Sequence, residues 1–354
     1  PGWLTRGGAG AGGFAAPRPF AAGAEGATAD NVRFADINGD KKADYLVLED
    51  TGAVRAWINN GGDGTDRWVD RGVYASGVAG ATADNVRFAD INGDGRTDYL
   101  VVAVDGSVHA YLNNGGDGQG GWTDRGTFAS GVPGATVSSV HFADINGDTK
   151  ADYLVVAEDG SVRAWVNNGG DGQGGFTERP FASGPAGATI GNVRFADADG
   201  DGKADYLVLG ANGQTTVWIN RGGDGAGGFE APRPFAAGPE GATADNVRFA
   251  DVTGDGKADY LVVGDDGSVR AWLNNGGDGQ GGWTVYGIFA SGVAGATADN
   301  VRFADTDNDG RADYLVVADN GSVRAHLNHG GDAGGWIDRG TLAAGTAPAG
   351  QVHI

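Results

Sequence analysis

The segment "DINGDGRTDYLVV", residues 90–102, places three acidic residues and an Asn within nine residues and then becomes apolar without a break. The hexapeptide "NVRFAD", or a close variant, leads into it, and the same combination recurs along the chain at intervals of about 54 residues. Copies of the acidic segment begin at Asp36, Asp144, Asp197, Asp251 and Asp305. The chain of 354 residues is therefore built from six near-identical units.

Each unit has the pattern of four short antiparallel strands. In the second unit we expect strands over 85–90, 98–103, 107–114 and 122–131. The pair Asp105-Gly106 suits a tight two-residue hairpin turn, because both central residues of such a turn need positive φ. Four-stranded units at a fixed period are typical of β-propeller blades. The sequence thus predicts an all-β propeller, a single domain over 1–354, with complete blades near 31–84, 85–138, 139–191, 192–245, 246–299 and 300–350.

The two ends of the chain match parts of the same unit. Residues 1–30 resemble residues 218–243, which supply the third and fourth strands of a unit, and "QVHI" at 351–354 resembles the start of a first strand. We therefore predict a seventh blade, shared between residues 1–30 and 351–354. About 20 residues of such a blade are absent, so a six-bladed ring is the alternative.

The acidic loop has the donor spacing of a calcium site. Acids fall at loop positions 1, 5 and 9 and Asn, Asp or Thr at position 3, while position 7 offers its backbone carbonyl; hard oxygen donors of this kind suit Ca²⁺. The predicted ligands are Asp36, Asn38, Asp40, Lys42 and Asp44; Asp90, Asn92, Asp94, Arg96 and Asp98; Asp144, Asn146, Asp148, Lys150 and Asp152; Asp197, Asp199, Asp201, Lys203 and Asp205; Asp251, Thr253, Asp255, Lys257 and Asp259; and Asp305, Asp307, Asp309, Arg311 and Asp313. This predicts about six Ca²⁺ ions. An Asx-rich turn without metal is the alternative.

Individual loops depart from this pattern in ways that predict unequal sites. Asp199 and Asp307 add a fourth acid to their loops, whereas Thr253 replaces the position-3 ligand and should weaken its site. Lys41 and Thr149 occupy a position that is Gly in the other loops, so we expect a strained backbone at both.

The overall charge agrees with a demand for cations. The formal net charge is −21, and 20 of the 46 acidic residues lie in the six loops. Such a charge argues against binding to nucleic acid, whose phosphates would be repelled. The chain contains no Cys, which excludes disulfides and thiolate sites, and no apolar stretch of the length that a membrane span needs.

The loop motif resembles the FG-GAP or VCBS repeat of integrin α-chain propellers and of secreted microbial proteins. The resemblance covers the whole chain and implies a calcium-binding propeller outside the cell. Propeller lectins of the Psathyrella velutina type are similar in plan, which implies sugar binding between blades. Their sugar-contacting residues have no identifiable counterparts in this sequence.

Candidate ligand residues follow the third strand of each unit. The aromatic residues Trp68, Trp122, Trp283 and Trp336 and the loop residues Asn113, Asn114 and Asp117 combine flat rings with amides and a carboxylate. Packing of the rings and turn formation by the loop are the alternatives. One further column, Arg33, Arg87, His141, Arg194, Arg248 and Arg302, is expected to form structural salt bridges rather than an anion site.

The sequence contains no arrangement typical of catalysis, since it repeats the same groups around a ring instead of gathering unlike groups at one place. We therefore expect a non-catalytic, extracellular propeller that binds glycans or glycoproteins at repeated sites. The alternatives are an ancillary domain of a secreted hydrolase and an integrin-like adhesion module that binds protein.

Overall fold

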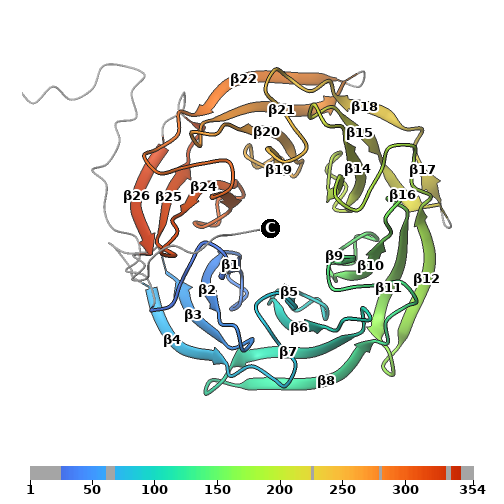
Figure 1. Cartoon of the computed structure of the whole chain (residues 1–354), viewed down its shortest axis with the longest axis vertical. Helices are drawn as coiled ribbons and strands as arrows, with labels where there is room; N and C mark the ends of the chain where they lie inside the picture. The colour runs from blue at the N-terminus through green and yellow to red at the C-terminus, as the bar shows by residue number, and fades with distance from the viewer. Residues whose placement is uncertain (1–24, 61–67, 225–226, 279–280, 332–335, 344–354) are drawn as a thin grey trace, which may run out of the picture.

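The computed structural model describes residues 25–60, 68–224, 227–278, 281–331 and 336–343, the last range as backbone only. Six four-stranded antiparallel sheets surround a common axis as blades (Figure 1). The strands of each blade follow one another in chain order, with the first strand nearest the axis. This confirms the predicted all-β propeller of four-stranded blades.

The strands occupy the same four places in every blade. The innermost strands are β1 (Val32–Ala35), β5 (Val86–Ala89), β9 (Val140–Ala143), β13 (Val193–Ala196), β19 (Val247–Ala250) and β23 (Val301–Ala304). The second strands are β2 (Asp44–Leu48), β6 (Asp98–Val102), β10 (Asp152–Val156), β14 (Asp205–Leu209), β20 (Asp259–Val263) and β24 (Asp313–Val317). The third strands are β3 (Val54–Asn59), β7 (Val108–Gly116), β11 (Val162–Gly170), β15 (Thr215–Trp218), β21 (Val269–Gly277) and β25 (Val323–Asn328). The outermost strands are β4 (Trp68–Ala75), β8 (Gly121–Ala129), β12 (Gly175–Ala182), β18 (Arg233–Ala236), β22 (Gly282–Ala290) and β26 (Trp336–Ala343). Blade 4 adds a short pair, β16 (Asn220–Gly223) with β17 (Gly228–Phe229).

The prediction of seven blades is wrong, because blade 6 closes directly onto blade 1. The Tyr45 hydroxyl of β2 donates to the Gly321 carbonyl of blade 6 at 3.0 Å. The Asn59 amide donates to the Thr306 carbonyl at 2.8 Å. Val317 packs in one apolar cluster with Val32 and Tyr45. These contacts repeat those at the other junctions and leave no place for a blade between them, so the six-bladed alternative holds. The segments 1–24 and 351–354 of the predicted split blade lie outside the described residues.

The apolar core is distributed over the junctions between blades. At the first junction, Leu46 and Ala56 of blade 1 pack with Val86 and Tyr99 of blade 2. The second strands are almost entirely buried because both of their faces are covered by neighbouring blades, which explains their continuous apolar sequence. Each junction thus depends on the blade on either side of it.

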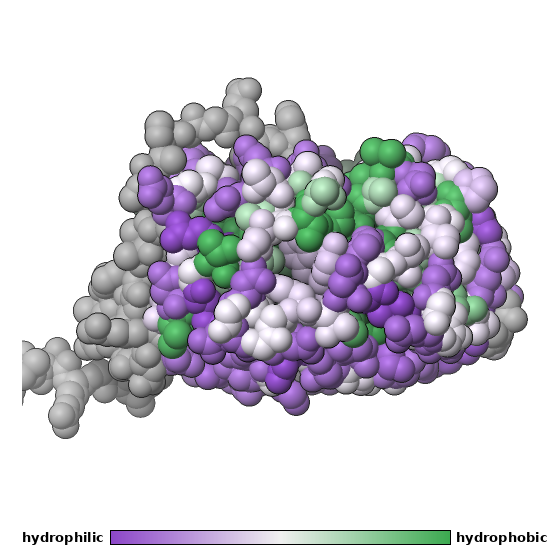
Figure 2. Space-filling model, turned by 90° about the horizontal axis from the view of Figure 1, so that it is seen from below, coloured by the Kyte–Doolittle hydropathy of each residue, from purple (hydrophilic) through white to green (hydrophobic). Residues whose placement is uncertain are grey.

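One side of the ring has a mostly polar surface. Figure 2, which shows the side of the ring below β8 in Figure 1, has hydrophobic residues only in small separate groups on a hydrophilic face. Within the described residues, no helix has the length and apolar character needed to cross a membrane.

The tight turn between the second and third strands fits closely against the next blade. Gly106 has a φ of 76°, and a Cβ placed on it would lie 2.3 Å from the Cβ of Ala135. Its carbonyl accepts a hydrogen bond from the Tyr153 hydroxyl at 2.8 Å. Gly118, in the loop after β7, has nearly the same φ of 78° but nothing within 4 Å of such a Cβ.

We predict that Gly106→Ala lowers the free energy of unfolding much more than Gly118→Ala does. Both changes place a Cβ at positive φ, which costs about 1–2 kcal/mol, and only Gly106→Ala adds overpacking at the junction, which costs a further ~1–3 kcal/mol. Urea denaturation followed by tryptophan fluorescence measures the difference. Equal losses in the two variants would show that the turn does not hold the blades together.

Candidate functional site

The acidic loop between the first and second strands is a tightly curled turn. In blade 2, Asp90 accepts the backbone N–H groups of Gly93 at 2.7 Å and Gly95 at 2.8 Å. Asn92 accepts the N–H of Asp94 at 2.9 Å, and Asp94 accepts that of Arg96 at 2.8 Å. The side chains at positions 1, 3 and 5 therefore turn back over the loop, as an Asx-rich turn requires and as a cation cage also requires.

The ninth loop residue is a fully buried carboxylate. Asp98 has no exposed surface and accepts the backbone N–H of Ile91 at 3.0 Å and of Asn113 at 2.8 Å. The same pair of contacts recurs in the other blades, for example from Ile37 and Asn59 to Asp44. One carboxylate thus joins the start of the loop to the third strand.

Each loop is also bonded to the loop of the next blade. The Ala151 N–H donates to the Asp90 carbonyl at 2.7 Å, and the equivalent bond across the closing junction runs from Ala43 to Asp305 at 2.9 Å. The buried Asn113 amide donates to the Ile37 carbonyl of the preceding loop at 2.9 Å. The six loops therefore form a continuous hydrogen-bonded ring on one face of the propeller.

Two loops bring three carboxylates to one point. The ligand atoms of Asp197, Asp199 and Asp205 lie within 4.8 Å of one another, as do those of Asp305, Asp307 and Asp313. These are the two loops with an acid at position 3. The oxygen-only donor set and its spacing fit Ca²⁺.

The extra acid of these two loops is accompanied by an extra base. Arg221 replaces the Asn that follows the third strand in most other blades, and its guanidinium lies 2.8 Å from Asp199 and 2.9 Å from Asp201. His329 holds the same position beside the other four-acid loop and lowers the pKa of Asp307, although burial is the larger influence and raises it. Blade 4 and blade 6 therefore offset part of their added negative charge.

The predicted backbone strain is confirmed. Lys41 and Thr149 have φ values of 66° and 70°, and Asn308, which replaces a Gly at position 4, has 63°. Non-Gly residues adopt this left-handed region only where the surroundings compensate for its cost. Here the compensation includes the Lys41 and Thr149 N–H groups, which donate to the position-1 carboxylates at 2.6 and 2.7 Å.

The predicted ligand residues have unequal access to solvent. Asn113 is buried, and its amide is engaged by backbone carbonyls. Asp117 accepts the Ser76 N–H at 2.8 Å and its hydroxyl at 2.5 Å across the junction. Asn114 donates to Thr123 and lines a cavity of about 220 Å³ between blades 1 and 2. Of these three residues, Asn114 therefore borders this cavity.

The predicted aromatic residues lie at the junctions and are half-buried. Trp122 packs edge-on against Tyr74 of the preceding blade at 5.2 Å between ring centroids, and its indole N–H donates to the Tyr74 carbonyl. Trp283 packs in the same way against Phe235 at 4.7 Å. Trp68 contacts Tyr45, and the side chain of Trp336 lies outside the described residues. Trp122 and Trp283 also pack against Tyr99 and Tyr260 of their own blades, and ligand binding by the remaining exposed parts of the rings stays a prediction.

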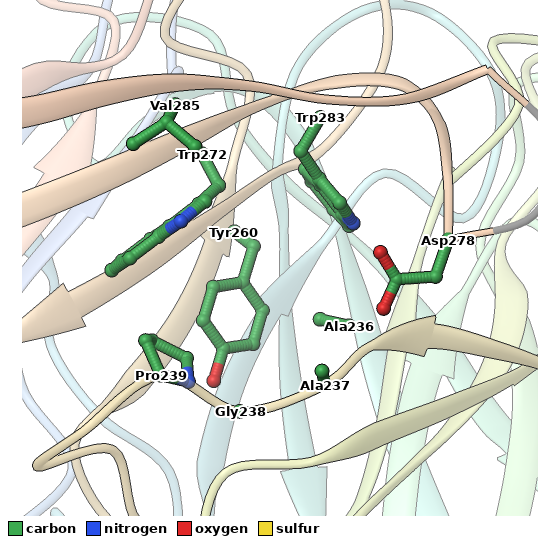
Figure 3. A pocket seen from close by; sticks show the side chains of 9 residues that line it. All are labelled: Ala236, Ala237, Gly238, Pro239, Tyr260, Trp272, Asp278, Trp283 and Val285. Carbon is green, nitrogen blue, oxygen red and sulfur yellow. The ribbon is translucent and has the colours of Figure 1, made fainter.

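A larger pocket, of about 340 Å³, lies between blades 4 and 5 (Figure 3). Its walls are Tyr260, Trp272, Trp283 and Val285 of blade 5 and the 236–239 segment that follows β18. The carboxylate of Asp278 faces into this space.

The Asp278 carboxylate differs from its equivalents in having no serine partner. At three other junctions the matching acid accepts a serine hydroxyl: Ser76 to Asp117, Ser130 to Asp171 and Ser183 to Asp224. Blade 4 has Ala237 at the serine position. The Asp278 N–H donates to the Phe235 carbonyl at 3.0 Å, but no hydrogen bond or ion pair reaches the Asp278 carboxylate from the described part of the chain. Sequence reasoning missed this site, although an Ala in a column of Ser was a visible signal.

The six buried loop carboxyls predict an unusual pH dependence for the metal-free protein. Burial raises the pKa of Asp44, Asp205 and Asp313 to about 7 and of Asp98, Asp152 and Asp259 to about 6. A carboxyl whose pKa is higher in the folded state stabilises that state fully below its unfolded pKa of about 4 and loses the contribution as the pH rises through the folded pKa. With a chelator present, the melting temperature should therefore be higher at pH 5 than at pH 8.

Calorimetry in EDTA at the two pH values tests this, with Asp98→Asn as the matched variant, since removal of one titrating carboxyl should reduce the difference. A higher melting temperature at pH 8 would contradict the buried-carboxyl account.

Comparisons with known proteins agree with this architecture. A profile of the FG-GAP-like repeat matches residues 36–101, 90–155, 150–208, 197–262 and 251–316. No curated protein matches the chain.

Similar solved structures share the fold at low sequence identity. An Agrocybe aegerita lectin, studied for recognition of non-reducing terminal N-acetylglucosamine, is 24% identical over 88% of this chain and 79% of its own, with a TM-score of 0.58. The BP39L lectin from Burkholderia pseudomallei is 14% identical over 88% of this chain and 83% of its own, with a TM-score of 0.55. A Photorhabdus luminescens Tc holotoxin pore structure is 21% identical over 85% of this chain but only 13% of its own, with a TM-score of 0.53.

The repeat matches begin at the acidic loops, where the hydrogen bonds between blades are concentrated, and together they span more than half of the sequence. The chain therefore belongs to the FG-GAP-like repeat family.

Proposed function

We propose that this protein is an extracellular, non-catalytic, calcium-stabilised propeller that binds carbohydrate at the junctions between its blades. The observation that carries the proposal is the pocket between blades 4 and 5, in which aromatic rings surround a carboxylate with no partner among the described residues.

The pocket has the composition of a sugar site. Its volume of about 340 Å³ is within the range of small-ligand pockets. The half-exposed rings of Trp272 and Trp283 offer apolar faces to the C–H groups of a pyranose. Asp278 can accept two sugar hydroxyls, and Arg270, whose guanidinium stands over the Trp272 ring at 5.5 Å from its centroid, offers hydrogen-bond donors above one face of that ring. Stacking together with directed hydrogen bonds gives both affinity and orientation.

Calcium has a different proposed role, the stabilisation of the acidic loops. Three carboxylates that converge within 4.8 Å repel one another unless protons or cations neutralise them. A bound Ca²⁺ would neutralise these carboxylates without protonating them. The side chains at loop positions 1, 3, 5 and 9 would bind the ion. Extracellular modules commonly bind Ca²⁺ at about 10⁻⁴–10⁻³ M, which suits the calcium level outside cells. This supports the proposed location.

Calcium should therefore stabilise the protein at neutral pH. We expect calcium to raise the melting temperature at pH 7.5 and EGTA to reverse the effect, since each site contributes about 2.7 kcal/mol when the ion is at a hundred times its Kd. Titration calorimetry should detect one site fewer in Asp94→Asn, whereas Asp124→Asn, which changes an exposed acid paired with His109, should keep them all. A melting curve that is the same in calcium and in EGTA would rule the sites out.

Glycan binding should depend on whether the Asp278 carboxylate is available to accept hydrogen bonds from the sugar. In Ala237→Ser the new hydroxyl should occupy the carboxylate as Ser76 occupies Asp117, and binding should fall about tenfold because a charge-assisted hydrogen bond to the sugar is lost. Stability should not fall, because the variant restores a bond that three other junctions have. A glycan array in millimolar calcium measures binding, with glycans that end in N-acetylglucosamine as the first probes.

The reciprocal variant Ser76→Ala provides the control. It removes the hydroxyl bond to Asp117 and keeps the backbone N–H bond, so the carboxylate beside Trp122 gains room for a ligand and should create an additional site instead of removing one. If Ala237→Ser binds glycan as tightly as the wild type, the glycan site does not lie in this pocket. If the intact protein binds no glycan at all, the carbohydrate proposal fails, and protein binding by an adhesion or ancillary module replaces it.

A further inference from the structure

A ring of basic side chains encircles the propeller axis. The second residue of every innermost strand is basic, and these strands lie nearest the axis (Figure 1). The ring consists of Arg33, Arg87, His141, Arg194, Arg248 and Arg302. All six occupy the same register, opposite a buried Leu of the second strand, as Arg87 lies opposite Leu100 and His141 opposite Leu154.

The predicted salt bridges of these residues are not formed. Within the described residues, no carboxylate oxygen lies within 4.0 Å of any of the five guanidinium groups. Arg87 instead donates to the Asp84 and Val86 carbonyls at 2.6 and 2.9 Å and to the Val137 carbonyl of blade 3 at 3.4 Å. A guanidinium has five N–H donors, so two of them remain unused.

The six residues are close enough to act on one another. Burial lowers the pKa of every member of the ring. The positive charge of a neighbouring ring member lowers the pKa further at Arg87, His141, Arg248 and Arg302. These pairs of neighbours connect all six positions, since Arg302 is influenced by both Arg248 and Arg33. Like charges held together in a half-buried place destabilise the folded state unless an anion neutralises them.

Nearby acids neutralise the ring only in part. Asp30, Asp84, Asp245 and Asp299 precede four of the arginines and favour their charged form from a distance. Asp84, Asp245 and Asp299 are exposed, so water screens much of their effect. Blades 3 and 4 have Ser138 and Gly191 in the same place and so contribute no acid there.

We propose that this ring is an anion-binding site on the propeller axis, for a multivalent oxyanion such as sulfate or phosphate. Guanidinium groups placed around a common axis, with donors left unused as at Arg87, suit an anion with oxygens on several sides, which can accept hydrogen bonds from more than one blade. The site is separate from the acidic loops, since those follow the C-terminal end of the innermost strands and the arginines lie near the N-terminal end. It is also independent of the sugar pocket.

Sulfate tests the proposal, because it does not precipitate millimolar calcium. The melting temperature of the intact protein is measured against sodium sulfate and against sodium chloride of equal ionic strength. We expect a saturable rise in sulfate, with a heat of binding in titration calorimetry. The double variant Arg87→Gln with Arg248→Gln should keep only the gradual, non-saturating effect of a kosmotropic salt.

Two further variants keep the test decisive. Arg163→Gln removes a positive charge from a rim side chain that pairs with Glu178, so its sulfate response should match that of the wild type. His141→Arg completes a ring of six arginines and should bind sulfate about tenfold more tightly, since one more charge acts on the anion at short range. Equal sulfate responses in the wild type and the double variant would overturn the proposal, as would no gain in His141→Arg.

Discussion

The buried carboxylate at the ninth loop position is the contact on which the other parts of each blade depend. Asp98 accepts one N–H from the loop that precedes its strand and one from Asn113 in the third strand. Asn113 in turn donates its side-chain amide to Ile37 in the neighbouring blade. A single charged group therefore fixes the curl of the loop, the position of the third strand and the junction between two blades. Removal of it would leave buried N–H groups unpaired, which costs more than the loss of the bonds alone.

That arrangement carries an electrostatic cost that the rest of the loop addresses. Burial disfavours the ionised carboxylate, and the acids at positions 1 and 5 add to the effect, as Asp90 and Asp94 do for Asp98. In each blade, two backbone N–H groups donate to the buried carboxylate and reduce this cost without removing it. Where a fourth acid enters a loop, at Asp199, the chain supplies Arg221 beside it. Backbone N–H donors and Arg221 therefore each reduce part of the repulsion between the loop carboxylates. A divalent cation bound in the loops would neutralise the rest.

The local features were predictable from the sequence, whereas the number of blades was not. Strand pattern and loop spacing depend on residues a few positions apart, so the second strands and the strained Lys41 appear where expected. The turn type was wrong, because Gly106 has positive φ but Asp105 does not, and five residues separate β6 from β7. Blade number depends on how blade 6 meets blade 1, through contacts such as Tyr45 with Gly321, 276 residues apart. The matching end segments resemble blade sequence, but sequence likeness carries no information on whether the ring is already closed. The Asp278 pocket was missed for a similar reason, since it depends on a pair from two adjacent blades.

Near-identity of the units makes every departure from them informative. A serine that becomes Ala237 frees a carboxylate, and the acid that faces the third-strand aromatic in several blades becomes Val285, which lines the same pocket. Both changes fall at one junction and leave the shared contacts between blades intact. The axis has the opposite character, because there the basic residue is kept in all six blades although no carboxylate among the described residues pairs with it. The acidic loops follow one end of each innermost strand, and the arginines lie near its other end. The guanidinium groups of this ring repel one another, so the chain keeps them only at a cost in stability or with a compensating partner.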